Sequence, residues 1–118
     1  MNIVSKRAYE AAGQNDGCRI LVDRLWPRGL SKSELHIDLW LPEIAPSVSL
    51  RKWFNHEPAK WPEFAARYLG ELRENSQAVQ RFNETARGHE TVTLVYGAKD
   101  KEHNHAAVLL EFLQQQFR

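Results

Sequence analysis

The chain has 118 residues, and its 16 lysines and arginines almost balance its 15 aspartates and glutamates, which leaves a formal net charge of +1. A chain of this length folds most economically as one unit, so we predict a single domain over residues 1–118. The balanced charge excludes a global attraction to nucleic acid or to an anionic membrane. Cys18 is the one cysteine, which excludes an intrachain disulfide, and no apolar stretch approaches the ~20 residues that span a bilayer. We therefore expect a soluble, cytoplasmic protein.

Short apolar segments predict the strands of the fold. In chain order, strands are expected at residues 2–5, 18–23, 37–41 and 91–97. The patterns at 18–23 and 91–97 are typical of strands buried on both faces, as in a parallel sheet. The segment at 37–41 is either a strand or an extended connection, because Pro42 and Pro46 end it.

Helices are predicted from capping residues and from apolar positions three or four residues apart. Ser31 and Glu34 have the spacing of a capping box, which predicts a short helix, and Ser47 is expected to cap a helix over 48–54. Further helices are expected from Pro58, through a second apolar run that ends at Gly88, and from about Asp100 to the chain end with Leu113 and Phe117 facing inward.

Strands separated by helical stretches predict a small, single-domain α/β fold with a short, mostly parallel sheet flanked by helices. In such sheets, ligands usually bind beyond the carboxyl ends of the strands. Two charged loops, at 23–29 and 97–105, each follow a predicted buried strand. If both strands run parallel in one sheet, the two loops open on the same edge. The polar residues expected to converge there are Asp23, Arg24, Arg28, Lys99, Asp100, His103 and His105.

Several motifs, in order along the chain, resemble the YeaO-like branch of a bacterial family called domain of unknown function 488. They include VDRLWPRG at 22–29 and AKDKEHN at 98–104, and the resemblance extends from about residue 1 to residue 117. It supports the single domain but implies no reaction, because the activity of that family is not established. Members of the wider family carry a Cys-His-Arg triplet where this chain has Asn104, His105 and Ala106. A thiol-based role therefore does not transfer to this chain.

The first charged loop has the composition of an anion pocket. The guanidinium forks of Arg24 and Arg28 suit phosphate or carboxylate, and Asp23 is a candidate orienting group or general base. Trp26 is expected to stack on the ligand or to exclude water. The alternative is an internal ion pair between Asp23 and one arginine, with Trp26 packed beneath it. One carboxylate cannot neutralise two guanidinium groups, so at least one arginine needs another partner.

The second charged loop offers further candidates. Lys99 is expected to contact the anion, and Asp100 is expected to cap the last helix, with a ligand contact as its other role. Asn104 is also a candidate ligand contact. His103 and His105 are candidate proton donors and acceptors, because an unperturbed imidazole has a pKa of ~6.5. On one helix, side chains two residues apart point ~200° apart, so only one histidine should face the cleft.

The segment 50–61 interleaves basic residues with aromatic ones, which can mark a nucleic-acid surface. Its apolar positions recur at helical spacing, which favours an amphipathic helix pair whose tryptophans fill the core. We therefore expect Trp53 and Trp61 to be core residues and do not favour a nucleic-acid partner. Arg51 and His56 are candidates for the rim of the cleft.

Two functions are compatible with these patterns. The first is a small enzyme acting on an anionic, phosphorylated or nucleotide-like compound, in which Asp23 and either His103 or His105 exchange protons. The second is a non-catalytic module that binds an anion, a nucleotide or an acidic segment of a partner through the same cleft. The sequence contains no Walker loop, GxGxxG, GxSxG, HExxH or CxxC motif, so neither a cofactor nor a metal is predicted. The oligomeric state is not predicted.

Overall fold

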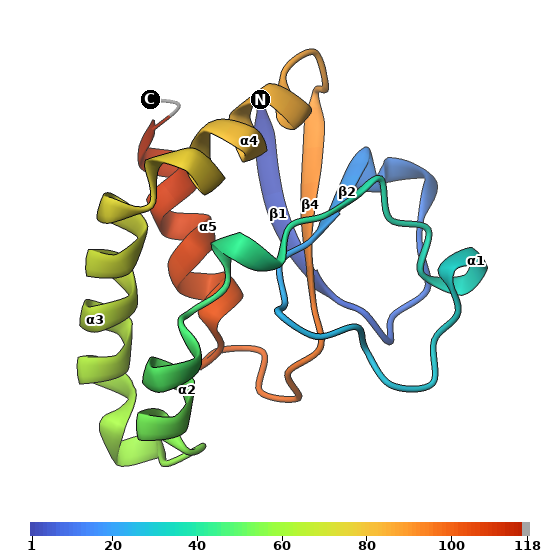
Figure 1. The fold of residues 1–118 in the computed structure, drawn as a ribbon. Helices are drawn as coiled ribbons and strands as arrows, with labels where there is room; N and C mark the ends of the chain where they lie inside the picture. The colour runs from blue at the N-terminus through green and yellow to red at the C-terminus, as the bar shows by residue number, and fades with distance from the viewer. Residues whose placement is uncertain (117–118) are drawn as a thin grey trace.

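The computed structural model describes residues 1–116, which form a parallel sheet with helices packed against it (Figure 1). The strands lie in the order β1 (Asn2–Arg7), β4 (Thr91–Tyr96), β2 (Cys18–Leu21) and β3 (Leu39–Trp40). Every neighbouring pair is parallel. This confirms the predicted α/β fold, and it places β2 and β4 side by side in the middle of the sheet, so that their carboxyl ends meet at one edge.

The helices are α1 (Lys32–Leu35), α2 (Val48–Phe54), α3 (Trp61–Glu74), α4 (Ser76–Ala86) and α5 (His105–Gln116). In Figure 1, α2 to α5 lie on one side of the sheet, whereas α1 and its long connections lie on the other. Within residues 1–116, no helix combines the length and the apolar character needed to cross a membrane.

Two hydrophobic clusters explain why the central strands are apolar on both faces. Ile20 and Leu94 face the main core, which α3, α4 and α5 complete. Leu21 and Val95 face a smaller cluster on the opposite side, where Leu35 of α1 packs against them. Because successive side chains of a strand alternate between faces, a sheet covered on both sides needs continuous apolar runs. The continuous apolar runs of β2 and β4 in the sequence are therefore explained by hydrophobic clusters on both faces of the sheet.

The predicted helix caps at Ser31 and Ser47 are confirmed. The Ser31 hydroxyl accepts the Glu34 N–H at 3.1 Å, while the Glu34 carboxylate accepts the Ser31 N–H at 3.0 Å. The Ser47 hydroxyl accepts the Leu50 N–H at 3.1 Å and begins α2. Both caps satisfy N–H groups that have no partner within the helix.

Pro58 is the first residue of a 3-10 helix over Pro58–Lys60, and α3 follows it from Trp61. One predicted helix start is wrong. The last helix begins at His105 and not near Asp100. The expected inward orientation of Phe117 lies outside the described residues.

The late start of α5 has a local cause. The Asp100 carboxylate accepts the N–H groups of Glu102 and His103, both at 2.9 Å, which closes a turn in place of a first helical turn. Asn104 is the residue that caps α5, because its side-chain oxygen accepts the Ala107 N–H at 2.9 Å. The cap predicted at Asp100 therefore belongs to Asn104, which is buried.

Candidate functional site

A pocket of about 630 Å³ opens at the edge where β2 and β4 end. One wall comes from residues 23–25 after β2 and from residues 97–98 and 103–105 after β4. The opposite wall comes from α2 and from the start of α3. The pocket thus lies at the carboxyl ends of parallel strands, where this class of fold usually binds its ligands. The predicted site residues that line it are Asp23, Arg24, His103, Asn104 and His105.

Asp23 joins the two loops at the base of the pocket. Its Oδ2 accepts the Gly97 N–H at 2.8 Å, and its Oδ1 lies 3.1 Å from Nε2 of His105. The same Nε2 lies 3.0 Å from the carbonyl oxygen of Val22. Because this nitrogen faces two acceptors, we assign the tautomer of His105 that carries a hydrogen on Nε2.

The Nε2–H of His105 points at the Val22 carbonyl rather than at the carboxylate. Asp23 Oδ1 is therefore a buried acceptor that makes no hydrogen bond within residues 1–116, although Nε2 is close to it. The two side chains are 18% and 16% exposed, so the pair is only partly screened by water. A carboxylate and an imidazole in this arrangement can share or transfer a proton at the pocket wall.

Arg24 is held by the backbone and not by a carboxylate. Its guanidinium group donates to the carbonyl oxygens of Ala45, at 3.3 Å, and Pro46, at 3.1 Å. Within residues 1–116, no carboxylate lies at ion-pair distance from it. Carbonyl oxygens orient a guanidinium group but leave its charge uncompensated. Arg24 therefore presents a fixed positive charge to the pocket.

The α2 wall adds basic side chains and an unusual backbone turn. Arg51 and Lys52 line the pocket from α2, and His56 lines it from the turn that follows. Asn55 and His56 both adopt left-handed conformations, with φ of 48° and 55°. Two successive non-glycine residues in this region are uncommon, and such strain is often found at binding sites. The rim positions predicted for Arg51 and His56 agree with this placement.

Aromatic rings form the back of the pocket. Phe54 and Phe64 have ring centroids 4.5 Å apart, and Trp61 stacks on Phe64 at 5.4 Å. All three line the pocket, although only Phe64 is fully buried. The sequence indicated that Trp61 is a core residue, and it does pack against the core. Periodicity alone did not show that its other side lines a pocket.

Both predicted histidines of the second loop line the pocket. His103 precedes α5, so the argument that two helical residues would face opposite sides does not apply to this pair. Its ring lies 5.3 Å from that of Trp61, and its Nδ1 lies 3.4 Å from the Asp100 carboxylate. Hydrogen bonds from the backbone N–H groups of His103 and Glu102 hold the pKa of Asp100 below its usual value.

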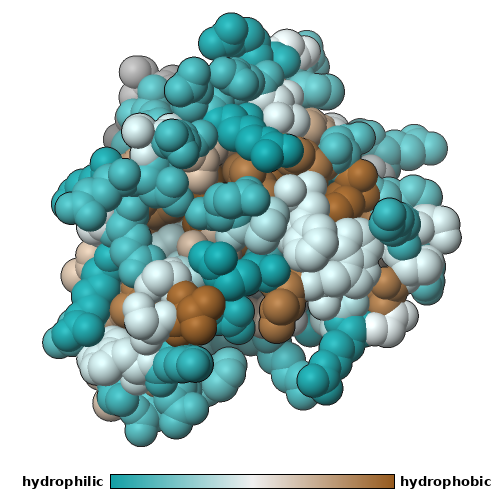
Figure 2. Space-filling model, viewed as in Figure 1, coloured by the Kyte–Doolittle hydropathy of each residue, from teal (hydrophilic) through white to brown (hydrophobic). Residues whose placement is uncertain are grey.

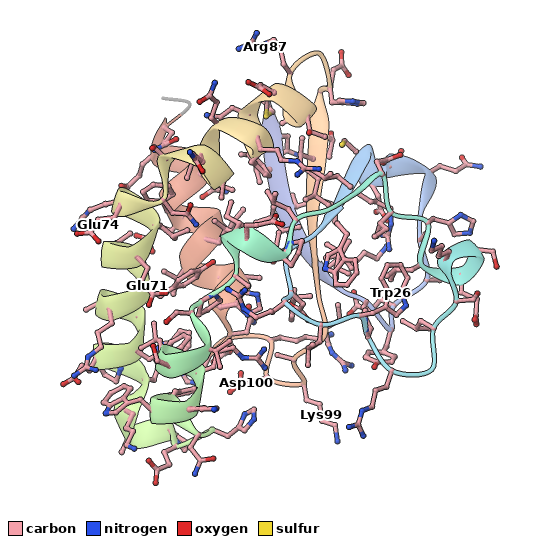
Figure 3. All side chains as sticks on the ribbon, in the orientation of Figure 1. Trp26, Glu71, Glu74, Arg87, Lys99 and Asp100 are labelled. Atoms are coloured by element: carbon pink, nitrogen blue, oxygen red, sulfur yellow. The ribbon has the colours of Figure 1, made fainter. Side chains whose placement is uncertain are left out.

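Four predicted ligand contacts lie outside this pocket. Trp26 lies on the α1 side of the sheet, where its Nε1 donates to the Leu30 carbonyl at 2.7 Å (Figure 3). Lys99 extends away from the ribbon in the same view, and Arg28 is exposed. Asp100 closes its own turn. The ligand roles predicted for these residues stay predictions, and we do not include them in the pocket.

The pocket combines positive charge with apolar surface. Arg24, Arg51 and Lys52 contribute three positive charges, and Asp23 contributes one negative charge. Hydrophobic and weakly polar residues interrupt the hydrophilic surface in the middle of Figure 2. Leu25 and Val48 line the pocket mouth and are 70% and 51% exposed. This composition suits a ligand with both an anionic and an apolar part.

The described residues offer no evident metal site. Within residues 1–116, no group of three or more His, Cys, Asp and Glu side chains is placed to hold an ion. Cys18 is buried on β2, where burial and then the charge of Asp38 raise the pKa of its thiol. A raised pKa and burial make a thiol unreactive, so Cys18 is not a candidate nucleophile.

Comparison with known proteins places this chain in a family. Residues 2–118 match the family described as the inactive DUF488-N3 subclade. The chain is 46% identical over 114 residues to the uncharacterised protein YeaO of Escherichia coli (strain K12), covering 97% of this chain and 98% of that protein. It is 38% identical over 107 residues to the uncharacterised protein Rv3073c of Mycobacterium tuberculosis, covering 91% and 89%. No solved structure gave a significant match. The chain therefore belongs to the domain of unknown function 488 family, in its DUF488-N3 inactive subclade.

Proposed function

We propose that this protein binds an anionic small molecule, of a phosphorylated or nucleotide-like kind, in the pocket between α2 and the sheet edge. The observation that carries the proposal is the state of Arg24. Its guanidinium group is oriented by the Ala45 and Pro46 carbonyls and meets no carboxylate within residues 1–116. A preorganised, uncompensated guanidinium group at a pocket wall favours binding of phosphate or carboxylate.

The rim of the pocket supports the same ligand class. Arg51 and Lys52 are exposed on α2 and line the same pocket as Arg24. Long basic side chains can move toward a bound anion without rearrangement of the backbone. A dianion such as a phosphate monoester would therefore meet one fixed cation and two adaptable ones.

The description of the subclade as inactive favours the non-catalytic form of this proposal. In that form the protein is a binding module that captures an anion or a nucleotide without converting it. An acidic segment of a partner protein is a weaker candidate, because the ligand must enter a pocket of about 630 Å³ rather than lie on an open surface.

Catalysis is the second candidate, and the pair of Asp23 and His105 is the observation that favours it. Nε2 of His105 lies 3.1 Å from Asp23 Oδ1, which has no hydrogen bond of its own within residues 1–116. A ligand that disturbs the Val22 contact of His105 would let the imidazole donate to Asp23. His105 would then act as a general acid or base, with Asp23 orienting it.

The binding proposal is tested by calorimetric titration with inorganic phosphate, ribose 5-phosphate, adenosine 5′-monophosphate and acetate. Arg24→Gln should lower the affinity for the tightest-binding of these ligands by about tenfold or more, because a hydrogen bond to a charged group contributes ~1.5–3 kcal/mol. Arg28→Gln is the matched control, since it removes the same charge from the same loop but lies outside the pocket. Equal losses in the two variants would contradict the proposed location, and absence of binding to wild type would contradict the proposal itself.

The two forms of the proposal are separated by following the bound ligand over time. Mass spectrometry of each ligand after incubation should detect no conversion if the protein is a binding module. Conversion by wild type that disappears in His105→Gln, with binding retained, would establish the catalytic form instead.

A further inference from the structure

The pocket has an aromatic side as well as a cationic one, and we propose that the bound anion carries a flat ring that packs against Phe54, Trp61 and His103. We call these three residues the aromatic wall. The inference rests on the binding function proposed above and specifies its ligand. In this proposal the aromatic wall selects ligands that carry a ring, whereas the basic side chains bind the anionic group.

The first observation is the way in which Phe54 and Trp61 are supported. Phe64 lies behind both of them, at 4.5 Å from Phe54 and at 5.4 Å from Trp61 with an angle of 27° between the ring planes. Phe64 is 3% exposed, whereas the other two rings are only partly buried and line the pocket. Phe54 and Trp61 therefore form an aromatic surface backed by the core, which is suited to stacking because it needs no reorganisation.

His103 is the second observation. Its ring lies 5.3 Å from Trp61, and its side chain is 51% exposed. The Asp100 carboxylate, 3.4 Å from Nδ1, holds it in that place. The imidazole and indole rings are tilted by 55° and are not stacked on each other. A flat ring can thus pack on Trp61 beside His103.

The third observation is the mixed lining of the pocket. The lining residues include Arg24 and the basic residues of α2 as well as the aromatic wall. A small ringless anion would leave the wall in contact with water. A ligand with an anionic group joined to a ring would cover both surfaces in a pocket of about 630 Å³, which is within the usual size range for small-molecule sites.

Core packing is the ordinary explanation of an aromatic cluster, and it accounts for Phe64 and Tyr68, which are buried. It does not account for the partly exposed rings of Phe54 and Trp61 inside a pocket that also holds three basic side chains. Stacking of a base on an aromatic side chain strengthens binding by about tenfold or more.

The test compares adenosine 5′-monophosphate with ribose 5-phosphate, which share the phosphate and the sugar and differ by the adenine ring. Phenyl phosphate and inorganic phosphate form a second pair that differs by a ring. In calorimetric titration, the ring-bearing member of at least one pair should bind about tenfold tighter. Trp61→Leu should abolish this preference by weakening the ring-bearing ligand much more than its ringless partner. Trp53→Leu is the matched control, because Trp53 also packs partly buried against the core but lies on α2 and outside the pocket.

A second measurement on the wild type covers the case in which Trp61→Leu does not fold. The indole N–H resonance of Trp61, assigned with Trp61→Phe, should shift on addition of adenosine 5′-monophosphate and stay in place with ribose 5-phosphate. Equal affinity within both pairs would overturn the aromatic-wall inference and leave the binding proposal standing. A ring preference without any shift at Trp61 would overturn it as well. Absence of binding by all four compounds would refute both proposals together.

Discussion

Asp16→Asn should destabilise the protein more than any other single acid-to-amide change discussed below. Asp16 lies before β2, and its Oδ2 is 2.6 Å from Nη1 of Arg19, whose side chain is 4% exposed. The same carboxylate accepts the Gly13 N–H at 2.9 Å and lies 3.3 Å from Nζ of Lys6. The other guanidinium nitrogens of Arg19 donate to the Leu35 carbonyl, at 3.1 and 2.9 Å. Asp16 is therefore the one carboxylate that compensates this buried charge within residues 1–116.

The expected loss in the free energy of unfolding follows from the groups that Asp16→Asn keeps and removes. Asparagine retains the shape and one acceptor oxygen, but it removes the negative charge beside a buried guanidinium group. Removing one partner of a fully buried ion pair costs about 3–5 kcal/mol, and a hydrogen bond to a charged group contributes about 1.5–3 kcal/mol. Because the Asp16 side chain is still 13% exposed, we expect a loss of about 2–3 kcal/mol. For a domain of this size, that corresponds to a fall in Tm of roughly 8–12 °C.

The destabilisation caused by Asp16→Asn should depend on pH. Burial raises the pKa of Asp16, but hydrogen bonds from the Gly13 N–H, Arg19 and Lys6 outweigh burial and lower the pKa below its ordinary value. A carboxyl group with a pKa lower in the folded than in the unfolded state contributes stability above the unfolded pKa of about 3.9. That contribution is lost as the pH falls through the folded pKa. The difference between wild type and Asp16→Asn should thus be full at pH 7 and should shrink below about pH 4.

Urea unfolding followed by tryptophan fluorescence, at pH 7 and at pH 3, measures the loss of unfolding free energy and its dependence on pH. Glu63→Gln is the matched control, because Glu63 forms an ion pair with Arg67 at 2.6 Å in which both side chains are more than half exposed. Such a pair contributes less than about 1 kcal/mol. The reasoning fails if Asp16→Asn costs no more than Glu63→Gln, or if its cost is the same at the two pH values.

Three further changes test the local structure in and around the pocket. Asn104→Ala should lower the free energy of unfolding by about 1 kcal/mol in urea titration, because it removes the cap of α5. Gly97→Ala should weaken anion binding measured by calorimetry with little effect on stability, since its new Cβ would lie 3.1 Å from the Asp23 carboxylate and shift it by a few tenths of an ångström. Tyr68→Phe should lower stability by about 1–2 kcal/mol in thermal unfolding, because the buried hydroxyl donates to the Ile44 carbonyl at 2.7 Å. An unchanged unfolding curve for Asn104→Ala or Tyr68→Phe, or unchanged ligand affinity for Gly97→Ala, would contradict the corresponding assignment.

Much of the fold could be predicted because its causes are local in the sequence. The apolar runs of β2 and β4 indicate strands covered on both sides, and the caps at Ser31 and Ser47 lie next to the helices that they begin. The start of α5 was missed because Asp100 and Asn104 are both good capping residues. Their competition is decided by a turn that the Asp100 carboxylate closes, which the pattern of residue types does not reveal.

The candidate site was partly predictable for a related reason. Asp23 and His105 lie close to the ends of elements whose direction the parallel sheet determines, so their meeting follows from topology. Arg28 and Lys99 belong to the same loops but lie farther from the strand ends, and loop conformation decides where they point. Trp61 was assigned to the core because helical periodicity shows which face is apolar and not whether part of that face lines a pocket.

The adjacent Asp23 and Arg24 suggest an internal ion pair in the sequence, and their separation in the fold is what makes the pocket positive. Asp23 points toward Gly97 and His105, which fasten it to the loop after β4 and to the start of α5. Arg24 points toward the backbone carbonyls before α2. The carboxylate is therefore used to hold the two loops together, and the guanidinium charge next to it stays available for a ligand. For this reason, Asp23→Asn would disturb the positions of both loops, whereas Arg24→Gln would remove charge while the loops stay joined.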